Sequence, residues 1–150
     1  MILRAARHED LGEILALLAA GQASSRGEAA PEVPGPGHAA ALEAIAADPN
    51  QRLVCAEADD GAVVGTMQLT FIPGLARGGA WRMQIEAMRV RGDRRGEGLG
   101  REMVGWALER ARERGCGLVQ LTSDASRVDA HRFYASLGFE ASHVGFKLRP

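Results

Sequence analysis

The sequence predicts a mixed α+β fold, in which helices cover both faces of a mostly antiparallel sheet. Apolar residues alternate with other residues over 63–71, which is the period of a long strand. Apolar residues recur at helical spacing over 99–114, and a strand candidate stands on each side of that helix. Strands that follow one another through turns, and then a strand–helix–strand unit, indicate this fold class.

The N-terminal half is predicted to place two helices between strands. Leu11, Ile14 and Leu18 share one helical face, and Gly21 ends that helix. Asp59-Asp60-Gly61 is a hairpin turn signal. The expected elements are a strand at 2–6, a helix from Leu11 that ends at Gly21, a loop at 22–37, a helix at 38–47, and strands at 52–58 and 63–71.

The C-terminal half is predicted to alternate strands with helices. Gly115 and Gly117 end the long helix, and Gly138 ends a shorter one. The expected elements are a strand at 81–90, helices at 99–114 and 130–137, a strand at 118–122 and a closing strand pair within 139–148.

Composition excludes several classes of protein. The 150 residues suit a single domain, 1–150, and a net charge of -1 argues against a nucleic-acid-binding domain. The N-terminus has no signal-peptide pattern and no apolar run is long enough for a membrane span, so we expect a cytoplasmic protein. Cys55 and Cys116 are far apart, and the four histidines lack metal spacing, so we expect neither a disulfide framework nor a metal site.

The most informative segment is a glycine-rich turn at 91–101, between the strand at 81–90 and the long helix. Gly96, Gly98 and Gly100 let the backbone curl so that several N–H groups point into one concavity, and the helix adds its positive dipole end. Such a turn binds phosphate or is only a tight connection between strand and helix; Arg94, Arg95 and Arg101 favour a polyphosphate ligand. A P-loop is excluded because the only lysine is Lys147, and the dinucleotide pattern fails at its sixth position.

At this point the chain resembles the GNAT superfamily of acyl-CoA-dependent N-acetyltransferases. The run Arg95-Gly96-Glu97-Gly98-Leu99-Gly100 matches its R-x-x-G-x-G/A signature, and residues 130–139, AHRFYASLGF, match its second signature, A-x-x-F/L-Y-x-x-x-G-F. The order of predicted elements is also that of the superfamily. Residues 129–143 look like the branch that contains aminoalkylphosphonate acetyltransferases.

The resemblance implies that acetyl-CoA is the cosubstrate. It implies that the strand before the glycine turn offers its backbone to the pantetheine arm through Met88, Arg89 and Val90, and that the turn binds the pyrophosphate. The residues implied for the turn are Arg95, Gly96, Glu97, Gly98, Leu99, Gly100 and Arg101.

Two residues are candidates for acid–base chemistry. Free amines are mostly protonated at neutral pH, so attack on a thioester needs a base. Glu86 matches the acidic position of the superfamily and, by period-two counting, shares a strand face with Met88 and Val90; alternatively it is a structural carboxylate. Tyr134, the only tyrosine, matches the superfamily's usual proton donor to the departing thiolate; alternatively it only packs beside Phe133.

Three further residues are assigned by position. Arg127 stands where many members of the superfamily have an asparagine that contacts the cofactor, and it is a candidate for a cofactor phosphate or a substrate anion; alternatively, it is only solvated. Trp81 and Arg82, beside the loop at 73–79, are candidates for the acceptor pocket. Alternatively, Trp81 anchors the start of the strand or contacts the second copy of a homodimer.

We therefore expect an acetyl-CoA-dependent N-acetyltransferase that acetylates a primary amine of a small molecule by direct attack in a ternary complex. No nucleic acid or membrane partner is expected. Two other readings remain. One is a non-catalytic acyl-CoA-binding sensor on the same fold, and the other is a protein that binds nucleotide phosphates through the glycine turn alone.

Overall fold

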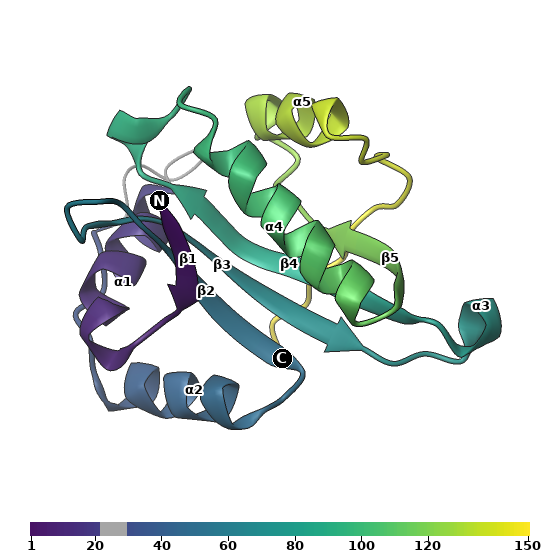
Figure 1. Cartoon of the computed structure of the whole chain (residues 1–150), viewed down its shortest axis with the longest axis horizontal. Helices are drawn as coiled ribbons and strands as arrows, with labels where there is room; N and C mark the ends of the chain where they lie inside the picture. The colour runs from purple at the N-terminus through teal and green to yellow at the C-terminus, as the bar shows by residue number, and fades with distance from the viewer. Residues whose placement is uncertain (22–29) are drawn as a thin grey trace.

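The fold is one five-stranded sheet with helices on both faces, as expected (Figure 1). A computed structural model describes residues 1–21 and 30–150, so half of the loop expected at 22–37 lies outside the described residues. The sheet order is β1-β2-β3-β4-β5; the first four strands pair antiparallel and β5 pairs parallel with β4. The strands are β1 (Ile2–Ala5), β2 (Gln51–Glu57), β3 (Val63–Ile72), β4 (Trp81–Val90) and β5 (Cys116–Leu121).

The helices occur along the chain in the order that the sequence predicts, apart from one short addition. The single turn α3 lies in a stretch expected to be loop. The helices are α1 (Leu11–Ala20), α2 (Pro36–Ala47), α3 (Ala76–Gly79), α4 (Leu99–Glu113) and α5 (Val128–Ser136), with 3-10 turns at His8–Asp10 and Gly92–Arg94.

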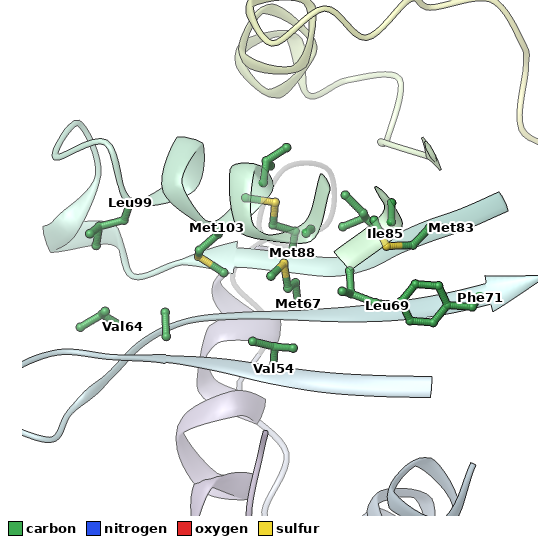
Figure 2. Close-up of a cluster of buried hydrophobic side chains, with 14 residues drawn as sticks. Val54, Val64, Met67, Leu69, Phe71, Met83, Ile85, Met88, Leu99 and Met103 are labelled. Carbon is green, nitrogen blue, oxygen red and sulfur yellow. The ribbon is translucent and has the colours of Figure 1, made fainter. Parts of the chain in front are cut away.

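The two faces of the sheet have separate apolar clusters. On one face, which we call the α4 face, Met67, Leu69 and Met83 belong to one buried cluster with Met103 of α4 (Figure 2). On the opposite face, the α1 face, Cys55 and Val63 pack against Ile14 and Leu17 of α1 (the cluster comprises Ile14, Leu17, Cys55 and Val63). Both α1 and α4 cover the sheet with the apolar side that their spacing of hydrophobic residues creates.

A β-bulge in β4 changes which side chains share a face. Gln68 of β3 pairs with Glu86, and Thr66 pairs with Arg89, so β4 has one residue more than β3 between these pairs. Ala87 in the bulge has a φ of 52°, in the left-handed region. Because paired residues point to the same side, Glu86 and Arg89 lie on the α1 face, whereas Met88 packs in the core of the α4 face. The expectation that Glu86 shares a face with Met88 and Val90 is therefore wrong.

The expected closing strand pair does not form. Residues 139–150 contain no strand, and Val144, Phe146 and Leu148 are 79%, 93% and 90% exposed. The alternation of these apolar residues suits a strand, but a strand exists only where a neighbour's backbone pairs with it. No backbone hydrogen bond between this tail and the sheet is found among the described residues.

Candidate active site

The site is centred on a free edge of β4. The parallel pairing between β4 and β5 ends at Ile85 and Leu121, so β4 runs on from Glu86 to Val90 without β5 beside it. β3 still pairs along the other edge of this stretch. The backbone of Met88, Arg89 and Val90, expected to contact the cofactor, thus lies on an edge that β5 leaves unpaired, and an unpaired edge is where one more extended chain can add.

The glycine turn lies directly after this free edge. Gly96 and Gly98 have φ values of 84° and 83°, and a Cβ added at either would meet nothing within 4 Å. Gly98 is the N-cap of α4 and has no side chain to satisfy the first N–H groups of the helix. The turn therefore leaves the start of a 15-residue helix without a side-chain cap and open at its positive end, an arrangement that suits a phosphate group.

The side chains of the turn differ in their contacts. Arg94 and Glu97 form an ion pair at 2.7 Å, and Arg101 reaches the Ser136 hydroxyl of α5 at 3.4 Å. Arg95 is exposed. Gly100 is where α5 comes close, because a Cβ there would lie 3.1 Å from the Phe133 ring.

Tyr134 of α5 lies beside the free edge on the α4 face. Its hydroxyl donates a hydrogen bond to the Met88 sulfur at 3.7 Å, and its ring makes edge-to-face contacts with Phe133 and Phe139. Burial raises the pKa of this phenol, while Arg127 and Arg89 lower it to a smaller extent. The hydroxyl is therefore protonated at neutral pH and is available as a proton donor.

Glu86 lies on the α1 face, across β4 from Tyr134. It is exposed, and it is the first β4 residue beyond the pairing with β5. Its neighbours on this face are polar: Gln84 accepts a hydrogen bond from Gln120 at 2.8 Å, and Gln68 donates one to Gln51 at 2.9 Å. Sequence reasoning missed this polar surface. The signal was the alternation of polar residues in the two central strands.

The structure separates the two residues that were expected to line the acceptor pocket. Arg82 pairs with Leu118 and Ile72, in register with Gln84 two residues on, so it belongs to the α1 face with Glu86. Trp81 packs against the core of the α4 face, and the Arg114 guanidinium lies 5.7 Å from its ring. A role for either in acceptor binding stays a prediction.

Arg127 is the N-cap of α5 and is half-buried. Its charge acts on both Arg89 and Tyr134, which places it near the free edge. It is not in an ion pair among the described residues. This position thus adds a positive charge near the site.

The other features of the surface lie elsewhere. A cavity of about 340 Å³ is lined by residues of β1, β2 and α2 together with Trp106, and by none of the expected site residues. Within residues 1–21 and 30–150, no group of three or more His, Cys, Asp or Glu side chains could hold a metal ion. None of the helices in the described part of the chain is long and apolar enough to cross a membrane.

Comparisons with known proteins agree with this geometry. The sequence profile of the acetyltransferase (GNAT) family matches residues 6–139. The chain is similar to an aminoalkylphosphonate N-acetyltransferase of Salmonella typhimurium, with 36% identity over 87 residues, which are 58% of this chain and 56% of that protein. The match thus spans little more than half the length of that relative.

Two solved structures resemble the whole chain. One, from Bacillus halodurans C-125, is described as a transcriptional regulator; it is 42% identical, with a TM-score of 0.89, over 99% of this chain and 98% of that one. The other is a putative acetyltransferase from Agrobacterium tumefaciens, 31% identical over the full length of both chains, with a TM-score of 0.85. With the profile match over most of its length, the chain belongs to the acetyltransferase (GNAT) family.

Proposed function

We propose that this protein transfers the acetyl group of acetyl-CoA to a primary amine of a small molecule. The observation that carries this proposal is the free edge of β4 beyond Ile85, which leads into the open glycine turn and lies beside the Tyr134 hydroxyl. An extended pantetheine arm fits the edge as an added strand, and the turn fits the pyrophosphate. Membership of the GNAT family supports the use of acyl-CoA.

The residues on the two faces of β4 have different roles in this reaction, a base on the α1 face and a proton donor on the α4 face. Acetyl-CoA supplies the acetyl group as a reactive thioester. Glu86, on the α1 face, takes a proton from the amine through water, and the neutral nitrogen forms the new N–C bond. As the C–S bond breaks, Tyr134 on the α4 face donates its proton to the sulfur, and the second proton, which the newly bonded nitrogen loses, returns through water to the Tyr134 oxygen. Donor and acceptor thus approach from opposite faces and meet at the gap between β4 and β5, in one ternary complex.

The acceptor is proposed to be a small amine. The partial match to an aminoalkylphosphonate N-acetyltransferase favours an amine with a phosphonate group as one candidate. The description of one similar structure as a transcriptional regulator offers a different class of function. A net charge of -1 does not favour DNA binding by this chain.

The experiment is to follow release of free CoA thiol from acetyl-CoA with a panel of amines, and to identify the acetylated products by mass. We expect at least one small amine to be acetylated with a thiol yield equal to the product yield. Acetyl-CoA that raises the melting temperature without any turnover would instead support the acyl-CoA sensor. Stabilisation by ATP or NAD, but not by acetyl-CoA, would support a protein that binds nucleotide phosphates.

A further inference from the structure

Arg89 is an unusual arginine because its guanidinium is half-buried and has no carboxylate partner within residues 1–21 and 30–150. Its Nη1 donates to the Met88 carbonyl at 2.8 Å, and its Nε is buried with no hydrogen-bond partner. By contrast, the buried Nε of Arg110 belongs to a guanidinium that is paired with Glu113. Burial of a cation is costly unless an opposite charge compensates it.

The surroundings of Arg89 add to this imbalance. Burial lowers its pKa most, Arg127 and Arg95 lower it further, and only Tyr134 acts in the opposite sense. No carboxylate acts on it among the described residues. The carbonyl end of α1 lies beside it and offers about half an elementary charge, which offsets the positive field only in part.

The side chain is held in place by a close approach to Gly21, the C-cap of α1. A Cβ on Gly21 would lie 1.8 Å from the Arg89 Nε, so only glycine leaves room for the guanidinium. Arg89 therefore points over the α1 face, the same face as Glu86. The β3 partners of these two residues, Thr66 and Gln68, are two residues apart, which is about 7 Å along a strand.

We propose that Arg89 binds an anionic group of the acceptor, and that the protein acetylates short amines carrying a carboxylate, phosphate or phosphonate. The inference rests on the proposed function and names its substrate class. When the nitrogen of a short amine lies near Glu86, an anionic group a few bonds away from that nitrogen lies near Arg89. A planar guanidinium suits such groups because it offers paired N–H donors. A phosphate of CoA is the other anion that Arg89 could bind, and the experiment below distinguishes it from an anionic group of the acceptor.

The first arm compares amines of matched length in steady-state assays at constant ionic strength: β-alanine and 2-aminoethylphosphonate against propylamine. The variant Arg89→Met keeps the length of the stem and removes the charge. We expect the kcat/KM for the anionic amines to fall by about ten- to a hundredfold more than that for propylamine, mainly through KM. Arg112→Met, an exposed arginine of α4, is the matched control and should keep the wild-type preference.

The second arm moves Arg89 without changing it. Gly21→Ala places a methyl group against the guanidinium, so the preference for anionic amines should fall here as well. Gly12→Ala is the control on the same helix, because a Cβ there meets nothing within 4 Å. Circular dichroism melts establish that each variant is folded.

Three results would overturn the proposal. Equal losses with anionic and neutral amines would assign Arg89 to the chemical step at Tyr134, and a loss of acetyl-CoA affinity would assign it to a cofactor phosphate. A wild-type enzyme that favours propylamine would also contradict it. If no amine is acetylated, the proposed function fails, but calorimetry with propylphosphonate still tests this inference. Binding to wild type but not to Arg89→Met would support an anion site at Arg89. No binding to wild type would refute such a site.

Discussion

The Tyr134 hydroxyl has only a sulfur, that of Met88, as its hydrogen-bond acceptor within the described part of the chain. A thioether is a weak acceptor, so the O–H is free to turn to a better one. Tyr134→Phe keeps the ring contacts with Phe133 and Phe139 and removes this donor. We expect kcat to fall by about ten- to ten-thousandfold with little change in acetyl-CoA affinity, measured by steady-state kinetics and calorimetry. A near-normal kcat would remove Tyr134 from the mechanism.

The raised pKa of Tyr134 adds a dependence on pH. Because burial moves the pKa above its usual value of 10.0, the hydroxyl keeps its proton to a higher pH than a free tyrosine. The advantage of wild type over Tyr134→Phe should therefore persist up to pH 10 and shrink as the pH rises through the pKa of the folded protein. An advantage that shrinks between pH 6 and 8 would point to another group.

A substitution at Glu86 tests the role of the base proposed on the α1 face of β4. Glu86→Gln keeps the shape of the side chain and removes the basic carboxylate. The amine most needs a base at neutral and lower pH, so the variant should lose about tenfold or more in kcat/KM there and less as the pH approaches the pKa of the amine. A pH–rate profile identical to that of wild type would leave Glu86 with a structural role.

At the scale of elements, the junction between β4 and α4 sets the cofactor site. Gly98 has a φ of 83° and faces open space, so Gly98→Val strains the backbone and fills the place where a phosphate would approach. We expect a sharp loss of acetyl-CoA affinity in a folded protein, measured by calorimetry. Gly105→Ala, in the middle of the same helix with nothing within 4 Å of the added Cβ, should leave the affinity intact. Unchanged affinity in Gly98→Val would place the phosphate site elsewhere.

The same junction shows what sequence periodicity predicts well. The strand at 81–90 and the start of the helix at Leu99 are confirmed, because regular alternation and a glycine-rich boundary mark them directly. The prediction that Glu86 shares a face with Met88 and Val90 was wrong, because the bulge at Ala87 inserts one residue and reverses the alternation after it. An alanine gives no sign of a positive φ. The strand pair predicted within 139–148 was wrong, because strand formation depends on a pairing partner that local sequence does not reveal.

At the scale of the whole molecule, an ion-pair cluster joins β1, β2 and the turn before α1. Arg4 binds Asp10 through two nitrogens, at 2.8 and 2.9 Å, and also contacts Glu57. The hydrogen bonds from Arg4 lower the pKa of the buried Asp10 carboxyl. The stability that this carboxylate contributes is therefore present above its usual pKa of 3.8 and is lost as the pH falls through the lower value of the folded protein.

Asp10→Asn should lower the free energy of unfolding by about 2 kcal/mol at pH 7, since Arg4 keeps Glu57 but loses its buried carboxylate. Urea unfolding measures the difference. The difference in unfolding free energy should narrow as the pH falls below 3.8, where the carboxyl of the unfolded chain takes up a proton, and should be smallest below the lower pKa of the folded protein. A difference that is independent of pH would mean that the charge of Asp10 does not contribute. Glu9→Gln, at an exposed position in the same turn, is the control.

The central claim is that acetyl-CoA binds along the free edge of β4 and the glycine turn. Titration of labelled protein with acetyl-CoA, followed by backbone amide NMR shifts, tests it most directly. The account predicts the largest shifts between residues 86 and 101 and at the Tyr134 amide. Shifts confined to the cavity between β1, β2 and α2, with residues 86–101 unaffected, would contradict it.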